Sequence, residues 1–282
     1  MHDYPLVLSE QTINEFDQRG FVLTSGVLSS DEVDRYGVAV DAEVARRTQG
    51  DQRTMVQKSR YEQSFIQCMR LWETEPVVRE LSCDSRLAGM AAQLLGESGV
   101  LMWQDQALYK EAGGQATTPH QDQTFWPVGD SPIISAWIAL DDVSVRGGAM
   151  AYVPGSHKAG ALRVVDITHR TEPYDILTDP ALQGAQPEFV EVSAGDVIWH
   201  HGYTVHQAAA NQTNQTRRVF TVVYISDAGR RAKSFPCFPL DRAGVGQGDL
   251  IQGEGLPRLW PPQSTLPEPG LDIGGATGPQ HH

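Results

Sequence analysis

The chain has 282 residues, a length that a single all-β domain with added helices can reach. Thirty-five acidic residues against 22 basic ones give a formal net charge of −13, and no cluster of lysines and arginines stands out. An acidic surface repels phosphate groups, so the composition argues against nucleic acid and anionic membranes as partners. We expect a small-molecule substrate instead.

Cysteine usage and hydropathy indicate a protein with reduced cysteines and without a membrane-spanning segment. Cys68, Cys83 and Cys237 are widely spaced and form no CxxC pair, which argues against a disulfide framework and a zinc cluster. The first residues lack the basic and apolar regions of a signal peptide. No run of about 18 apolar residues suits a membrane span. We therefore expect three free thiols and a cytoplasmic location.

The first third of the chain has mostly helical patterns. Serine capping signals at Ser9 and Ser29 open two of the predicted helices, and Gly20 ends the first of them. A short strand is predicted over residues 21–23, and a polar loop occupies residues 48–64. The helices are expected at 8–18, at 30 to about 47, at 65–74, and at 76–95 with a break near 83–84.

From Gly99 onward the apolar runs are short, rich in β-forming residues and separated by turn residues. No long helix lies between them, and this spacing is typical of an all-β sandwich or barrel. The long mixed segment 160–186 and the polar loop near 50–64 are candidate lids. The eight candidate strands are 100–109, 119–123, 133–140, 149–153, 189–192, 197–201, 204–208 and 218–225.

Glycine and proline dominate after about residue 238. This composition predicts an extended tail over 239–282, with Leu259-Trp260 docking on the domain and the last dozen residues disordered.

The sequence Thr118-Pro119-His120-Gln121-Asp122-Gln123 is the stretch most suggestive of chemistry. In an extended strand, His120 and Asp122 project from the same face because they are two residues apart. An imidazole and a carboxylate on one face suit a divalent metal, provided that a third ligand comes from elsewhere. Phe125 and Trp126, just beyond, are candidates for an apolar wall of the same site.

Three histidines near residue 200 are candidates for the third ligand. His200 and His201 are neighbours in a predicted strand, so at most one of them faces a metal. Small residues follow His206 and leave room for a ligand, so spacing favours it while the other two remain alternatives. His157 lies in turn-rich sequence and is expected to brace a loop.

Arg217 and Arg218 begin the last apolar strand. A guanidinium buried there requires an anion, and its planar fork matches a carboxylate. Both faces of this strand are apolar, so alternation does not choose between the two arginines.

A set of ordered motifs resembles the phytanoyl-CoA dioxygenase family of iron(II)- and 2-oxoglutarate-dependent oxygenases, over about residues 10–230. The His-x-Asp pair alone is a weak signal, whereas the complete order is specific. The matching residues are Leu108-Tyr109-Lys110, His120-Gln121-Asp122-Gln123, Trp137 to Asp142, Gly147-Gly148-Ala149-Met150, Val153 to Lys158, Gly195-Asp196, His206 and Arg217.

The resemblance implies a mainly β fold with flanking helices, namely a double-stranded β-helix (a jelly-roll, cupin-like barrel). It implies one domain over residues 1–238, with the helices of about 1–98 packed on the barrel. Iron(II) would be held by His120, Asp122 and His206, with 2-oxoglutarate and O2 as co-substrates. The co-substrate residues it implies are Arg217, Trp137, Gln106 and Lys110.

One position departs from the family pattern. Relatives often carry a hydroxyl residue two positions after the distal histidine, where this chain has Ala208. The hydrogen bond to the co-substrate carboxylate would then come from Thr204, Thr221 or a water molecule.

The implied activity is hydroxylation of an unactivated C–H bond of a small molecule, with release of succinate and CO2. Two alternatives use the same barrel: a cupin-type metal-dependent hydrolase or isomerase without 2-oxoglutarate, and a non-catalytic small-molecule-binding barrel. An arginine at the position of Arg217 argues against the first, and the intact His-Asp-His set argues against the second.

Overall fold

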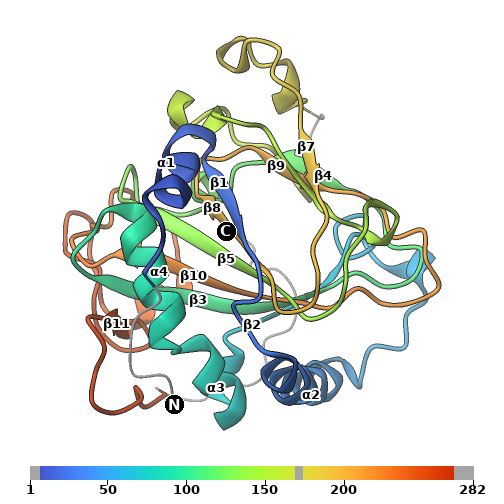
Figure 1. The fold of residues 1–282 in the computed structure, drawn as a ribbon, viewed down its shortest axis with the longest axis horizontal. Helices are drawn as coiled ribbons and strands as arrows, with labels where there is room; N and C mark the ends of the chain where they lie inside the picture. Colours follow the sequence, from blue (N-terminus) through green and yellow to red (C-terminus); the bar gives the residue numbers. More distant parts are fainter. Residues whose placement is uncertain (1–6, 169–173, 270–282) are drawn as a thin grey trace.

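Two antiparallel sheets face each other in the computed structural model, which describes residues 7–168 and 174–269 (Figure 1). The larger sheet has seven strands in the order β1-β8-β5-β10-β3-β11, with β2 also paired to β3, and the smaller one runs β4-β9-β6-β7. The predicted jelly-roll architecture is therefore confirmed, although the two sheets do not close into a continuous barrel. The strands are β1 Phe21–Thr24, β2 Ile66–Met69, β3 Val100–Tyr109, β4 Thr117–His120, β5 Ile133–Ala139, β6 Met150–Tyr152, β7 Glu188–Val190, β8 Val197–His201, β9 His206–Ala208, β10 Val219–Ser226 and β11 Arg258–Trp260.

Local capping chemistry sets the N-terminal helices. In α1 (Glu10–Arg19) the Ser9 side chain accepts from Thr12 N–H, and Gly20 ends the helix in the left-handed conformation that glycine adopts without strain. Ser29 and Glu32 form the capping box of α2 (Ser30–Thr48). The break predicted near 83–84 separates α3 (Pro76–Ser82) from α4 (Ser85–Leu95).

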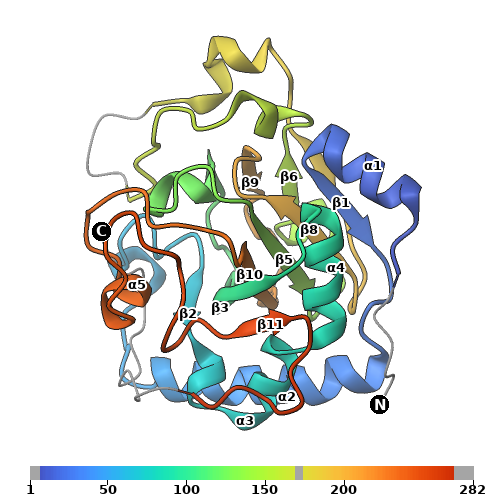
Figure 2. The same ribbon diagram turned by 90° about the vertical axis from the view of Figure 1, so that its left-hand side faces the viewer.

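The two faces of the larger sheet have different partners. Its outer face packs against α2, α3 and α4 in a cluster that includes Val40, Leu81 and Leu87 from the helices and Met102 and Val222 from the sheet. Figure 2 shows these helices beside and below the sheet. The inner face packs against the smaller sheet. Covering the outer face with helices leaves the space between the sheets for a site.

The segment 65–74 was predicted to be helical, and this prediction is wrong. Residues 66–69 form β2, which pairs with β3, and Leu71–Glu73 form a 3-10 turn. The apolar residues of this segment fit a helical period, but hydrogen bonding along the free edge of β3 determines the structure. Asp105 of β3 then caps the turn by accepting from the N–H groups of Leu71 and Trp72.

The chain beyond residue 238 is more ordered than the predicted extended tail. It contains α5 (Phe238–Arg242) and β11, and Leu240, Val245 and Ile251 pack around Trp103 in a separate apolar cluster. Leu259 and Trp260 dock on the domain as expected, since Leu259 is buried and Trp260 packs on Gly89 of α4. The last dozen residues, expected to be disordered, lie outside the described part of the chain.

Cys68, Cys83 and Cys237 are all buried and unpaired, as the sequence predicted. In the two described ranges, no helix is long and apolar enough to cross a membrane.

Candidate metal centre and cavity

His120 and Asp122 come from the end of a strand and the turn that follows it. His120 is the last residue of β4, whereas Asp122 begins a 3-10 turn over Asp122–Phe125. The expectation that both residues lie on one strand is therefore wrong. Gln121 between them keeps an extended backbone, with φ −115° and ψ 126°. Extended geometry at this one residue keeps both side chains on the same side.

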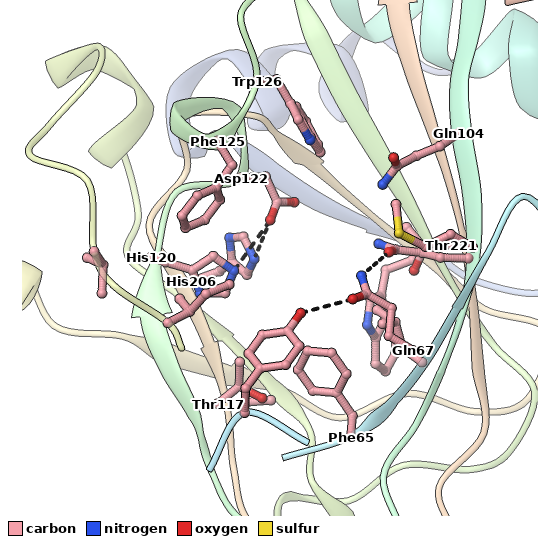
Figure 3. A pocket seen from close by; sticks show the side chains of 18 of the residues that line it. Phe65, Gln67, Gln104, Thr117, His120, Asp122, Phe125, Trp126, His206 and Thr221 are labelled. Atoms are coloured by element: carbon pink, nitrogen blue, oxygen red, sulfur yellow. Dashed lines mark hydrogen bonds and ion pairs between the residues drawn. The ribbon is translucent and has the colours of Figure 1, made fainter. Parts of the chain in front are cut away.

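The pairing of β4 with β9 places His206 directly opposite His120. One nitrogen of each ring and one oxygen of Asp122 lie within 4.8 Å of one another. The Nε2 atoms of His120 and His206 lie 3.4 Å and 3.6 Å from the same carboxylate oxygen, Oδ1 (Figure 3). The structure thus brings together the three residues that the sequence resemblance implied as ligands.

The orientation of both rings fits a metal ion. Nδ1 of His120 lies 2.6 Å from the carbonyl oxygen of Thr118, and Nδ1 of His206 lies 3.0 Å from that of Thr204. A carbonyl oxygen only accepts, so each Nδ1 carries the hydrogen and each Nε2 keeps its lone pair toward Asp122. Metal-bound histidines are usually oriented by such backbone contacts.

The protonation states also suit a metal. Burial lowers the pKa of His206 to about 3, which keeps the ring neutral and able to donate its lone pair. Burial alone would raise the pKa of Asp122, but the neighbouring histidines, His206 foremost, hold it well below its ordinary value. A neutral imidazole and an ionised carboxylate are the forms that bind a divalent cation.

A third histidine, His200 of β8, also reaches Asp122. Its Nε2 atom lies 3.3 Å from Oδ2, whereas the other two rings lie nearest Oδ1. His201 points elsewhere and accepts a hydrogen bond from Tyr203 N–H at 3.0 Å. Of the adjacent pair His200 and His201, only His200 therefore faces the centre. It contacts Asp122 through the second carboxylate oxygen.

His157 lies away from the centre. Its Nε2 atom is 3.1 Å from the carbonyl oxygen of Asp17, so it braces its own loop against the last turn of α1.

Arg217 lies buried at the cavity without an acidic partner. Its Nη1 and Nη2 groups donate to the carbonyl oxygens of Gly148 and Leu108 at 3.0 Å and 3.2 Å, and its buried Nε has no partner. The guanidinium carbon lies 5.4 Å from the centre of the Trp137 ring. Burial lowers the pKa of Arg217 to about 10, which reflects the cost of a desolvated cation.

Arg218 is placed very differently. It pairs with Asp141 and, at 2.8 Å, with Asp41, outside the cavity. Of the two arginines that strand alternation left open, only Arg217, the one that the resemblance implied, is free to receive an anion from the cavity.

The two remaining residues implied by resemblance are separated by the structure. Gln106 lines the cavity, where its Oε1 accepts from Gln67 Nε2 at 2.6 Å. Lys110 does not line it: its ammonium group is buried against the carbonyl oxygens of Ser64, at 2.8 Å, and Gln115. The expected contact between Lys110 and a co-substrate is corrected accordingly, because this group holds two loops together.

The centre opens into a cavity of about 520 Å³, a size that accommodates a small-molecule ligand. Both candidate lids contribute to it, through Tyr61 from the first, with Phe65 just beyond that loop, and 164–168 from the second. Part of the second lid, 169–173, lies outside the described residues. Trp103 and Gln104 are among the lining residues that the sequence analysis did not assign to the site. No motif marks them, and their positions depend on strand register.

The jelly-roll sheets and the 2-His-1-carboxylate arrangement define a class of non-haem metal proteins. Within that class the chain belongs to the phytanoyl-CoA dioxygenase family, whose family model (PhyH) matches residues 16–219.

Curated relatives match at moderate identity. The chain is 28% identical over 162 residues to phytanoyl-CoA dioxygenase of Arabidopsis thaliana, a match that covers 56% of each protein. It therefore spans about half the length of this relative. It is 25% identical over 271 residues to phytanoyl-CoA dioxygenase domain-containing protein 1 of Danio rerio, covering 76% of this chain and 89% of that protein.

Solved structures cover more of the chain. The carbocyclase SnoK of nogalamycin biosynthesis, described as non-haem and α-ketoglutarate dependent, is 28% identical with a TM-score of 0.73, over 90% of this chain and 99% of SnoK. The epimerase SnoN, in complex with Fe3+, α-ketoglutarate and nogalamycin RO, is 27% identical with a TM-score of 0.70, over 89% of this chain and 98% of SnoN.

Proposed function

We propose that this protein is an iron(II)- and 2-oxoglutarate-dependent dioxygenase that hydroxylates an unactivated C–H bond of a small molecule. One oxygen atom of O2 enters the product and the other enters succinate, with release of CO2. The observation that carries the proposal is Arg217, a buried cation with an unpartnered Nε in the same cavity as the His-Asp-His centre. A metal site alone has no need of such a residue.

His120, Asp122 and His206 would hold iron(II), leaving the positions toward the cavity for small ligands. Bound there, iron(II) supplies O2 activation coupled to decarboxylation of 2-oxoglutarate. Arg217 would bind the far carboxylate of 2-oxoglutarate, and its unpartnered N–H fits a carboxylate oxygen. Trp137, buried against the guanidinium, fixes its orientation.

Thr221 supplies a second donor for the same carboxylate. Its Oγ1 is buried without a partner and the residue lines the cavity. Thr204, the other candidate for the bond missing at Ala208, already donates to the carbonyl oxygen of Gly20 at 2.7 Å. Thr221 is therefore the residue we assign to this role.

Phe125 and Trp126 lie beside the centre and exclude water from the reacting C–H bond. The ring of Phe125 is 6.0 Å from that of His120, centre to centre. Both aromatic residues follow Asp122 in the chain, so the segment that supplies a ligand also supplies the apolar wall.

Two other functions fit the barrel less well. A hydrolase or isomerase of the cupin type would need the metal centre but no buried arginine reserved for an anion. A non-catalytic binding barrel would need neither. We propose a cytoplasmic location because the three cysteines are unpaired. The acidic net charge argues for a small-molecule substrate and against a nucleic-acid or membrane partner.

Anaerobic addition of iron(II) and 2-oxoglutarate tests the proposal directly. We expect a weak visible charge-transfer band, and expect it to disappear in His206→Ala. Absence of the band in pure, iron-loaded wild-type protein would refute 2-oxoglutarate dependence. Because SnoK and SnoN are described as a carbocyclase and an epimerase, product analysis should score loss of two hydrogens and unchanged mass beside gain of one oxygen.

A further inference from the structure

We propose that the cavity selects an uncharged, flat, fused-ring substrate bearing a neutral polar group, rather than an acyl-CoA thioester. The inference rests on the proposed function in one respect, since it reserves Arg217 for 2-oxoglutarate. It otherwise depends on the aromatic walls of the cavity, on two polar groups that lack partners, and on the distribution of charge around it.

Two pairs of aromatic residues border the cavity from different parts of the chain. Tyr61 and Phe65 come from the loop before β2 and meet edge to face, with ring centres 5.1 Å apart. Phe125 and Trp126 come from the segment after Asp122, and in Figure 3 they lie across the open space from Phe65. Facing aromatic surfaces favour a planar ring system, because stacking adds to the burial of apolar area.

A bulge in β3 directs two neighbouring side chains into the same cavity. Gln104 pairs with Val223 and Met102 with Tyr224, so Trp103 is an additional residue in the strand. A bulge interrupts the alternation of side chains between the two faces. Trp103 and Gln104 therefore both line the cavity, whereas in a regular strand they would point to opposite sides.

Neutral polar groups of both residues lack hydrogen-bond partners. The indole Nε1 of Trp103 is fully buried and has no hydrogen-bond partner. Gln104 is 6% exposed, and its amide makes no hydrogen bond to the described residues. By contrast, Gln67 is already engaged, donating to Gln106 and accepting from Tyr61. A buried donor and a buried amide without partners fit a carbonyl, hydroxyl or amide of a neutral ligand.

The charges around the cavity disfavour a polyanion. Arg217 is the one lysine or arginine among its described lining residues, whereas Asp122 and Asp166 are acidic. Two basic residues of the flanking loop are paired, Arg53 with Asp51 and Glu62, and Lys58 with Glu111. The third, Arg60, borders a separate polar pocket and does not line this cavity. The phosphates of coenzyme A require several free cations, and the described lining of the cavity offers Arg217 alone.

Isothermal titration calorimetry with matched probes tests the inference. Anaerobic protein saturated with iron(II) and 2-oxoglutarate, which occupies Arg217, is titrated with 2-naphthamide, 2-naphthoate and octanoyl-CoA. We expect 2-naphthamide to bind about tenfold or more tightly than 2-naphthoate, because the buried carboxylate would lack a cation, and octanoyl-CoA not to bind. Equal or tighter binding of naphthoate, binding of octanoyl-CoA, or no binding of naphthamide would each overturn the inference.

Gln104→Leu should weaken naphthamide binding about tenfold by removing the amide partner. The matched control is Gln207→Leu on β9, a half-buried glutamine that does not line the cavity, and it should bind like wild type. Phe125→Ala gives a second variant, with the same expected weakening, should Gln104→Leu not fold. Unchanged binding in a folded Gln104→Leu or Phe125→Ala protein would count against the assigned contacts.

The same samples separate this inference from the proposed function. They are first scored for the charge-transfer band of iron(II) with 2-oxoglutarate. A missing band is a failure of the proposed function. A normal band together with wrong probe selectivity is a failure of the substrate class alone.

Discussion

His200 Nε2 lies 3.3 Å from Oδ2 of Asp122, while the Nε2 atoms of His120 and His206 lie nearest Oδ1 of the same carboxylate. Three histidines thus surround one carboxylate, and two of them share one oxygen. This division leaves Oδ1 for the metal and fixes the carboxylate through Oδ2. His200 is then a positioning residue, not a fourth ligand.

We expect His200→Phe to weaken metal binding by about tenfold, the lower end of the effect usually seen when a group orienting a metal ligand is removed. Titration of the metal-free protein with Mn(II), followed by calorimetry, measures the affinity. The charge-transfer band should return at saturating iron(II), because all three ligands remain. His201→Gln is the control, since His201 does not contact Asp122, and its metal affinity should match wild type.

Two results would contradict this role. Unchanged Mn(II) affinity in His200→Phe would mean that the contact with Asp122 does not orient it. Permanent loss of the band, as expected for His206→Ala, would instead make His200 a ligand.

Arg217→Met and Arg218→Met should separate co-substrate binding from surface pairing. Loss of the Arg217 guanidinium should weaken 2-oxoglutarate binding about 10- to 100-fold, the range expected for hydrogen bonds to a charged group. Arg218→Met breaks the pairs with Asp141 and Asp41 but should leave 2-oxoglutarate binding unchanged. The titration follows the charge-transfer band against 2-oxoglutarate concentration.

Thermal unfolding gives an independent measurement for the same pair. A ligand that binds only the native state raises Tm. Added 2-oxoglutarate should raise the Tm of wild type and Arg218→Met, and should do so much less for Arg217→Met. The opposite ranking would transfer the anion-binding role to Arg218.

The sequence predicted elements wherever local chemistry decides the structure. Ser9, Gly20 and the capping box of Ser29 fix the ends of α1 and the start of α2, and these signals are local. The prediction of a helix over 65–74 was wrong because the conformation of this segment depends on pairing with the edge of β3, which is distant in sequence. Composition does not reveal such pairing. The folded tail was underestimated for the same reason, since its apolar residues are few but pack on Trp103.

The candidate site divides in the same way. His120, Asp122, His206 and Arg217 lie in ordered motifs, so resemblance was enough to propose them. Strand alternation alone could not choose between Arg217 and Arg218, because both faces of the strand that follows them are buried, whereas the resemblance favoured Arg217. Trp103 was hidden by the bulge in β3, since a reading of alternating residues assumes a regular strand.

Thr221→Val tests which hydroxyl compensates for Ala208. The substitution preserves shape and removes a buried hydroxyl that has no partner, so the free energy of unfolding should not fall. Binding of 2-oxoglutarate should weaken about tenfold, as for loss of one hydrogen bond to a carboxylate. Thr204→Val is the matched control: it loses the bond to Gly20, so it should lose stability but keep its affinity for 2-oxoglutarate. A stable Thr221→Val protein with normal affinity would remove Thr221 from the proposed site.

Lys110→Met tests the structural role of the buried ammonium group through pH. Burial, with a smaller effect of Arg217, lowers the pKa of Lys110 from an ordinary value of 10.5 to about 7. Between these values the unfolded chain binds more protons than the folded one, so the contribution of Lys110 to stability increases as pH rises and is lost as pH falls toward 7. The stability of wild type minus that of Lys110→Met should therefore rise between pH 7 and pH 9.5, by up to about 1.4 kcal/mol per pH unit. Urea unfolding at several pH values measures this difference in stability. For the control variant Lys233→Met, at an exposed lysine, the difference from wild type should not change with pH. A flat or falling difference for Lys110→Met would show that the ammonium group remains charged in the folded protein.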